Sequence, residues 1–243
     1  MNTIKTLLLL GFAIIVIARR THESRSLSRR QYGNTENQLV NGSCAAITII
    51  YARGTLDPGN LGESVGPPFF DALVDIVGES NLVIQGVPYP AQIWGFAHGG
   101  SPVGSQNMAD LVALAASQCP YTKIVMSGYS QGGQLIHNAA DKLNASLTDD
   151  INSVVIFGDP YNGTAVGNVS ADKVLTICHS GDDVCRHQGD ITPAHLNYSG
   201  NAAEAANFVA EKADLNGTDS DTRDWKAWGQ WISELFTIIK NQL

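Results

Sequence analysis

The sequence predicts a three-layer α/β/α sandwich with a mainly parallel central sheet. Three observations support this fold class. Short apolar runs alternate with segments of helical periodicity, and turns rich in glycine, proline and aspartate separate them. A Gly-x-Ser-x-Gly sequence at 128–132 follows one apolar run and opens a helical segment. The chain has 243 residues, which is enough to bury the core of one such domain.

Five strands are predicted from short apolar runs that stop at turn residues. The first leads into the turn-rich loop 52–62, and the fourth is broken by Gly-Asp-Pro at 158–160. Loops that follow parallel strands are where α/β sheets build their sites. In chain order, we expect strands at 45–51, 81–85, 123–126, 151–157 and 174–178.

Helices are predicted where apolar residues recur at intervals of three and four. The first, 67–77, begins with proline and ends at Gly78. The second spans 105–117, and the third, 134–143, follows the Gly-x-Ser-x-Gly sequence. Residues 94–104 are expected to form a loop that carries surface aromatics.

Residues 1–18 are predicted to be a secretory signal peptide. A single basic residue, Lys5, precedes an apolar run that is short for a membrane span. An uncleaved signal anchor is the alternative, because no clear Ala-x-Ala site follows the run. Residues 19–30 are basic, rich in serine and end in two arginines, so we expect a short pro-segment. The protein is therefore expected to be secreted and extracellular.

The rest of the chain is strongly acidic. Residues 1–30 hold six of the 15 Lys and Arg residues but one of the 23 Asp and Glu residues, which leaves residues 31–243 with a net charge of −13. A domain of this charge repels phosphate backbones and is not expected to bind nucleic acid. We also expect a monomer with no integral membrane partner.

Four cysteines follow the predicted signal peptide, an even number typical of two disulfides. Three connectivities are possible. Cys178 and Cys185 would close a short loop, so we expect the pairs Cys44–Cys119 and Cys178–Cys185. A metal site is the alternative, but the paired Cys-x-x-Cys spacing is missing. Six sequons indicate a glycoprotein: Asn41, Asn144, Asn162, Asn168, Asn197 and Asn216.

Ser130 is the candidate nucleophile. It lies between an apolar strand and a helix, the context of the nucleophile elbow of α/β-hydrolases. The serine must occupy a strained turn, and side chains at Gly128 or Gly132 would collide with neighbouring backbone. The N–H of Gln131, at the start of the helix, would point toward the reacting carbonyl oxygen. The alternative is a turn with no catalytic role.

A serine hydroxyl needs a histidine to take its proton and an acid to orient that histidine. In α/β-hydrolases both follow the serine, the acid first. Beyond the helix lie His179, His187 and His195. We expect His195 rather than His187 to be the base, because it follows a proline-containing turn that can reach back over Ser130. His137 lies inside the helix and is interpreted as a helix-face residue.

The acid candidates are Asp159, Asp182, Asp183 and Asp190. Asp159, in Gly-Asp-Pro, is interpreted as a turn residue. Asp182 lies in the loop that a Cys178–Cys185 disulfide would clamp, which suits an orienting carboxylate. The residues alone barely separate Asp182 from its neighbour Asp183.

Four motifs, in this order, resemble those of the cutinase family. The segment Ile50–Gly62 is similar to the oxyanion loop of that family, and Gly128–Gly132, preceded by Cys119-Pro120, to its serine motif. Cys178-x-x-Gly-Asp-x-x-Cys185 is similar to its acid loop, and Pro193-Ala-His-Leu196 to its histidine loop. The likeness runs from about residue 44 to about residue 208.

This resemblance implies an α/β-hydrolase-like domain over residues 31–213 with no large lid. It implies Ser130 as the nucleophile, Asp182 as the orienting acid and His195 as the base. No metal or organic cofactor is needed for such a reaction. Asp183 is a departure from the family pattern, and two adjacent carboxylates are expected to raise one another's pKa.

The resemblance also implies an oxyanion hole. Its donors would be the N–H groups of Thr55 and Gln131, with the Thr55 hydroxyl as a further donor. Many cutinases carry serine at the position of Thr55. Threonine keeps the hydroxyl, but its methyl group restricts the rotamer.

The family covers cutinases, which cleave aliphatic polyesters, and acetylxylan esterases, which remove acetyl groups from xylan. The loop around Thr55 and the Gly181-Asp182 pair favour a secreted serine esterase that hydrolyses cutin-type polyesters and short-chain esters through an acyl-enzyme. Its expected partner is an insoluble polyester or plant cell-wall polymer. Val184 and Leu196 are expected to form an apolar rim for an acyl chain. A non-catalytic surface-binding protein on a hydrolase scaffold is the alternative of another class.

Residues 214–243 are expected to form an acidic linker and an amphipathic helix. Trp225, Trp228 and Ile232 begin a series of apolar residues at helical spacing. Such a helix is expected to dock on the core. The alternative is an exposed tryptophan face that touches a waxy or polymeric surface.

Overall fold

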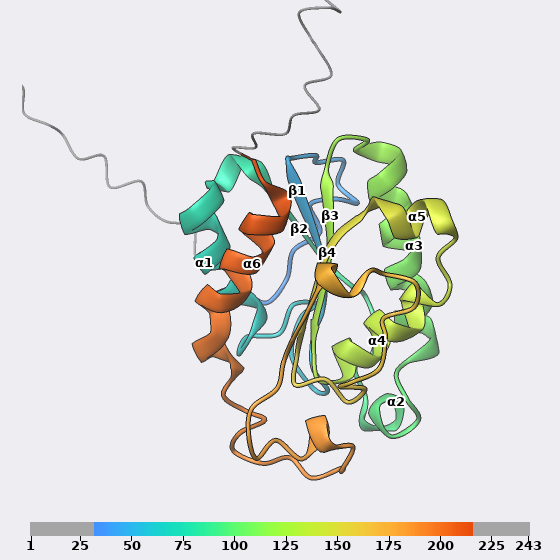
Figure 1. The fold of residues 1–243 in the computed structure, drawn as a ribbon, viewed down its shortest axis with the longest axis vertical. Coiled ribbons are helices and arrows are strands. Elements are labelled where there is room, and N and C mark those ends of the chain that lie inside the picture. The colour runs from blue at the N-terminus through green and yellow to red at the C-terminus, as the bar shows by residue number, and fades with distance from the viewer. Residues whose placement is uncertain (1–31, 216–243) are drawn as a thin grey trace, which may run out of the picture. The chain divides into compact units, whose positions relative to one another are not determined.

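The computed structural model describes residues 32–215. Its centre is a five-stranded sheet in the order β2-β1-β3-β4-β5, and each neighbouring pair is parallel (Figure 1). The strands are β1 (Ile47–Ala52), β2 (Leu82–Gly86), β3 (Lys123–Tyr129), β4 (Ile151–Phe157) and β5 (Val174–Ile177).

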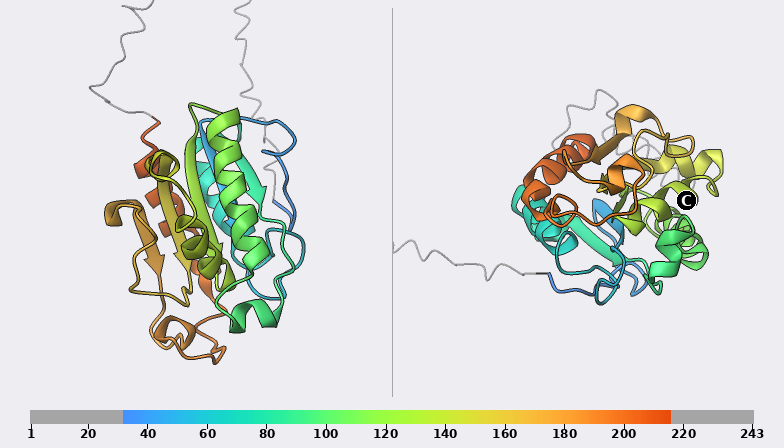
Figure 2. Two further views of the ribbon diagram at one scale, coloured as in Figure 1. Left: turned by 90° about the vertical axis from the view of Figure 1, so that its right-hand side faces the viewer. Right: turned by 90° about the horizontal axis from the view of Figure 1, so that it is seen from below.

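Helices cover both faces of the sheet (Figure 1, Figure 2). One layer contains α1 (Gly66–Val77) and α6 (Ala202–Ala213); the other contains α2 (Ile93–Ala97), α3 (Pro102–Gln118), α4 (Gln131–Ala140) and α5 (Ala145–Asp150). Alternate residues of a strand face opposite layers. Ile49 and Tyr51 of β1 belong to the core beneath α1 and α6, and Ile50 belongs to the core beneath α3 and α4. The predicted three-layer α/β fold is therefore confirmed.

Three helices, α2, α5 and α6, were not predicted from the sequence. The loop prediction for 94–104 is wrong in part, because α2 forms there and α3 begins at Pro102, where the Ser101 hydroxyl accepts the N–H of Gly104. The segments of α5 and α6 carried no predicted element. The buried face of α6 consists mainly of small side chains, which give a weak apolar pattern: Ala205, Ala206, Val209 and Ala213.

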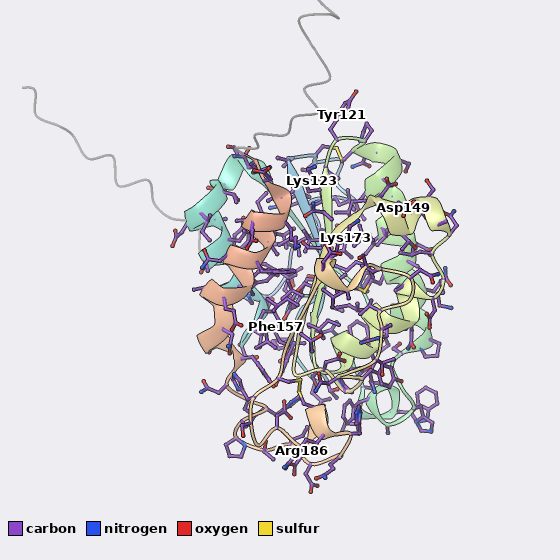
Figure 3. All side chains as sticks on the ribbon, in the orientation of Figure 1. Tyr121, Lys123, Asp149, Phe157, Lys173 and Arg186 are labelled. Atoms are coloured by element: carbon purple, nitrogen blue, oxygen red, sulfur yellow. A yellow bond between two sulfur atoms is a disulfide. The ribbon has the colours of Figure 1, made fainter. Side chains whose placement is uncertain are left out.

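The carboxyl ends of four strands lie side by side. Ala52 at the end of β1 is opposite Gly128 of β3, and Phe157 at the end of β4 is opposite Ile177 of β5. β3 and β4 are themselves neighbours. The loops that follow these strands therefore meet at one edge of the sheet. Figure 3 labels Arg186, from the loop after β5, at this end of the molecule.

Two disulfides are present, Cys44–Cys119 and Cys178–Cys185, the pairs expected from the sequence. The first joins the residues ahead of β1 to the end of α3, and the second closes the loop after β5. Within residues 32–215, no helix is long and apolar enough to cross a membrane. The predicted signal peptide, pro-segment and Trp-rich helix lie outside the described residues.

Candidate active site

Ser130 lies on a strained turn between β3 and α4. Its backbone has φ 55° and ψ −117°, a conformation that residues with a side chain rarely adopt. The turn packs so closely on β1 that a Cβ at Gly132 would lie 2.0 Å from the carbonyl oxygen of Ala52. A Cβ at Gly128 would lie 2.8 Å from the carbonyl carbon of Gly132. Both glycines are therefore required by close backbone approach, as the sequence predicts.

Ser130, His195 and Asp182 form one hydrogen-bonded line. The Ser130 Oγ lies 2.9 Å from Nε2 of His195, and Nδ1 of His195 lies 2.8 Å from Oδ2 of Asp182. All three residues are buried, with 4%, 2% and 0% of their surface exposed. These partners assign the neutral tautomer of His195, in which Nδ1–H donates to the carboxylate and Nε2 accepts from the serine hydroxyl.

Asp183 and His187, the alternatives to Asp182 and His195, contact other groups. The carboxylate of Asp183 pairs with Arg186, and Nδ1 of His187 lies 2.9 Å from the carbonyl oxygen of Pro160. Neither side chain belongs to the hydrogen-bonded line of Ser130. The geometry thus brings Asp182 and His195, and neither Asp183 nor His187, into line with Ser130. The residues alone favoured His195 over His187 but barely separated the two aspartates.

Asp182 is held as a carboxylate. Burial raises its pKa, but hydrogen bonds from the Tyr198 hydroxyl, from His195 and from the Val184 N–H together lower it below its usual value. The Tyr198 Oη lies 2.6 Å from Oδ2 and the Val184 nitrogen 2.9 Å from Oδ1. The expectation that Asp183 raises this pKa is therefore wrong, since these donors determine the net direction.

Tyr129 and Gly158 support His195 from two sides. The Tyr129 ring stacks on the imidazole with centroids 5.2 Å apart, and its hydroxyl donates to the His195 carbonyl oxygen at 2.8 Å. A Cβ at Gly158 would lie 2.9 Å from Cε1 of His195, so the turn after β4 touches that histidine. The carbonyl oxygen of Phe157, just before that turn, accepts the N–H of Ser130 at 2.9 Å. The end of β4 thus contacts both Ser130 and His195.

Thr55 and Gln131, the predicted oxyanion donors, are in contact. The Gln131 side-chain amide donates to the Thr55 hydroxyl oxygen at 2.8 Å and to the Gln92 carbonyl oxygen at 3.0 Å. Arg53 fixes the loop after β1, because its Nε donates to the Asp57 carbonyl oxygen at 2.7 Å. The Gln131 N–H is the first of α4, where helix N–H groups have no partner within the helix.

An open cavity of about 320 Å³ lies over Ser130. Its lining is mostly apolar and includes Leu56, Ile93, Ile191 and Leu196, each more than half exposed. Leu196 lines the cavity, in agreement with its expected place in an apolar rim. The expectation for Val184 is wrong: its side chain is 1% exposed, because the short turn Val184–Arg186 directs it inward beside Asp182. The other three were not predicted from the sequence; they lie in loops and in the unpredicted helix α2.

A second buried pair involves His137 and Asp159. The His137 Nε2 lies 3.0 Å from Oδ2 of Asp159, and its Nδ1 lies 3.2 Å from the Ala165 carbonyl oxygen. The other carboxylate oxygen accepts the Tyr161 N–H at 2.9 Å, as expected of a turn residue. His137 is therefore a buried partner of the turn after β4. Within residues 32–215, no group of three or more His, Cys, Asp and Glu side chains is placed to hold a metal ion.

Comparisons with known proteins agree on one family. The family model described as Cutinase matches residues 43–213. A cutinase of Botryotinia fuckeliana is 51% identical over 173 residues, which cover 71% of this chain and 86% of the relative. A cutinase of Monilinia fructicola is 49% identical over 171 residues, covering 70% of this chain and 85% of the relative.

Solved structures give a consistent picture of the fold. Trichoderma reesei cutinase in complex with a phosphonate inhibitor is similar with a TM-score of 0.70 and 44% identity, covering 74% of this chain and 80% of that one. An acetyl xylan esterase has a TM-score of 0.56 at 24% identity, covering 70% of this chain and 100% of the other. The second likeness concerns the fold alone.

Proposed function

Because the chain belongs to the cutinase family and is a serine carboxylic ester hydrolase, we propose that it cleaves cutin-type aliphatic polyesters and short-chain esters through an acyl-enzyme on Ser130. The observation that carries this proposal is the hydrogen-bonded line from Ser130 through His195 to Asp182 at the base of an apolar cavity.

In the proposed first step, Ser130 Oγ attacks the ester carbonyl carbon while its proton passes to Nε2 of His195. Asp182, held as a carboxylate by Tyr198 and Val184, stabilises the imidazolium that results. The imidazolium then protonates the leaving alcohol oxygen as the carbon–oxygen bond breaks. In the second half, a water gives its proton to His195 and attacks the acyl carbon. The imidazolium then returns a proton to Ser130 Oγ as the bond between the acyl carbon and Oγ breaks, which releases the acid and restores Ser130.

The negative oxygen of each tetrahedral intermediate is proposed to bind between the loop after β1 and the start of α4. The Gln131 side chain donates to the Thr55 hydroxyl oxygen, so the hydroxyl hydrogen itself is free to donate to an oxyanion. The N–H groups of Thr55 and Gln131 would supply the remaining donors. Gln131 thus contributes through its main chain and orients Thr55 through its side chain.

The exposed rim supports an insoluble aliphatic substrate. Leu56, Ile93, Ile191 and Leu196 surround the cavity and expose apolar surface around Ser130. Such a surface gains free energy by contact with hydrocarbon chains. Two disulfides and the apolar run at residues 7–18 support the proposal that the protein is secreted to reach such a polymer.

Ester preference is tested with the processed protein on p-nitrophenyl acetate, butyrate and palmitate, on solid cutin and on acetylated xylan. We expect butyrate turnover and release of hydroxy fatty acids from cutin, both abolished in Ser130→Ala. Acetate release from xylan without cutin products would make the protein an acetylxylan esterase. Equal, negligible turnover by wild type and Ser130→Ala would contradict the catalytic proposal.

Contact with the polymer is tested by Leu196→Ser, with Val40→Ser as the matched control. Both side chains are exposed, but Leu196 lines the cavity and Val40 does not. We expect Leu196→Ser to slow cutin hydrolysis more than hydrolysis of soluble butyrate ester, and Val40→Ser to slow neither. Equal behaviour of the two variants on cutin would contradict a role for the rim.

A further inference from the structure

We propose that His179 is a positioning residue for this reaction, a clamp between the loop that carries the acid and the loop that carries the base. The acid loop is 178–185 and the base loop is 192–201. The hydrogen bonds and the ring stacking of His179 hold the backbone next to His195 and keep Tyr198 against Asp182. The inference rests on the proposed function, because it assigns a role within the same site.

The two ring nitrogens of His179 both face oxygen atoms. Nδ1 lies 3.0 Å from the carbonyl oxygen of Ala194, and Nε2 lies 2.7 Å from Oδ1 of Asn201. The Asn201 amide nitrogen donates to Glu204 at 2.8 Å, which fixes the oxygen of that amide toward His179. Both oxygens are acceptors, so each contact is a hydrogen bond when the facing ring nitrogen carries a proton.

Tyr198 connects His179 to the acid. The main-chain N–H of His179 donates to the Tyr198 hydroxyl oxygen at 3.0 Å, and that hydroxyl donates to Asp182 at 2.6 Å. The imidazole also stacks on the Tyr198 ring, with centroids 4.2 Å apart and an interplanar angle of 19°. Tyr198 is fully buried, and its hydroxyl lies between the His179 N–H and the Asp182 carboxylate.

The clamp therefore restrains both the base, His195, and the acid that orients it, Asp182. Ala194 directly precedes His195, so a hydrogen bond to its carbonyl restricts the backbone on which the base is mounted. Tyr198 restricts the carboxylate that orients the base. The titratable and charged groups around the ring are Tyr198 in stacking contact, Asp182 through the Tyr198 hydroxyl, Glu204 through Asn201, and His195 beyond Ala194.

The kinetic test compares His179→Gln with His187→Gln on p-nitrophenyl butyrate. His187 is a matched control, an exposed histidine near the acid loop whose ring contacts one backbone carbonyl, that of Pro160. We expect kcat of His179→Gln to fall roughly tenfold with KM within about twofold, since a 1 Å misplacement of a catalytic group costs up to about a hundredfold. His187→Gln should keep kcat within about twofold. Equal kcat values for the two variants would overturn the inference.

Tyr198→Phe keeps the inference testable if His179→Gln folds poorly. It removes one buried oxygen while preserving the ring, and we expect a lower kcat with an unchanged KM. His179→Arg supplies a permanent charge with several donors and should recover part of the lost kcat. Wild-type kcat in a correctly folded Tyr198→Phe would overturn the path from His179 to Asp182.

A spectroscopic test does not depend on turnover. In ¹⁵N-labelled protein, a ring N–H of His179, assigned by comparison with His179→Gln, should be protected from exchange with solvent by its hydrogen bond. A ring whose N–H groups exchange as fast as those of a free imidazole would overturn the clamp even if the enzyme is active. Conversely, a wild type that cleaves no ester would overturn the proposed function, whatever the exchange rate of that N–H.

Discussion

Residues 32–215 contain two buried histidine–aspartate pairs of similar geometry, and they differ in what lies beyond the histidine. The nitrogen–oxygen distance is 2.8 Å for His195–Asp182 and 3.0 Å for His137–Asp159. The second nitrogen of His195 faces the Ser130 hydroxyl, which can give up a proton, whereas that of His137 faces a backbone carbonyl, which cannot. The comparison teaches that an oriented histidine becomes a base only when a proton donor faces its free nitrogen.

The largest expected difference between the pairs is in catalysis. Asp182→Asn should lower kcat about 10⁴-fold, because an amide there favours the wrong tautomer of His195. Asp159→Asn changes the same chemical group in the other pair and should keep kcat within about tenfold. The measurement is kcat on p-nitrophenyl butyrate for both variants. Similar losses in the two would show that the pairs are not functionally distinct.

A smaller loss of rate is expected at Thr55, on the other side of Ser130. Thr55→Ala removes one proposed oxyanion donor and should lower kcat about 10²- to 10³-fold, with little effect on the unfolding temperature. Thr55→Ser keeps the hydroxyl that Gln131 orients and should retain most of the activity. If alanine and serine have the same effect, the hydroxyl is not an oxyanion donor.

For the stability of the fold, the larger effect is expected at the second pair, His137–Asp159. His137→Ala leaves the carboxylate of Asp159 buried without its partner, which typically costs about 3–5 kcal/mol. Chemical denaturation should show this loss, while the folded fraction keeps kcat within about tenfold of wild type. A variant as stable as wild type, or one as inactive as Asp182→Asn, would contradict a structural role for this pair.

The smallest expected effect is a pH dependence at Asp182. Burial raises the pKa of this carboxyl, but its hydrogen bonds lower it below the ordinary value of about 3.9. A lowered folded-state pKa stabilises the fold above the unfolded value, and that contribution is lost as pH falls through the folded pKa. The difference in thermal stability between wild type and Asp182→Asn should therefore narrow below about pH 4. A constant difference down to pH 3 would contradict this.

The sequence predicted the frame of the site because the frame depends on local pattern. The strand before Ser130, the glycines at 128 and 132 and the disulfide loop all follow from residue type and spacing. Backbone packing against Ala52 explains why only glycine fits at position 132. These features constrain the chain over a few residues, so sequence reasoning reaches them.

Residues whose role depends on long-range contacts were harder to predict. The side chain of Asp182 accepts a hydrogen bond from Tyr198, whereas that of Asp183 pairs with Arg186. Tyr198 belongs to no sequence motif that would have indicated this difference. Val184 was misplaced because a single turn of helix directs it inward. His179 was noted as one of three downstream histidines, but its contacts with Ala194 and Asn201 exist only after folding.

Covalent labelling tests the central claim most directly. The protein is incubated with a p-nitrophenyl alkylphosphonate, which places a stable phosphonyl group on an activated serine as p-nitrophenol leaves. Intact mass and peptide mapping should show one adduct per chain, on Ser130, together with complete loss of butyrate turnover. An unmodified Ser130 in a fully inhibited enzyme, or full turnover by a chain labelled there, would contradict Ser130 as the nucleophile.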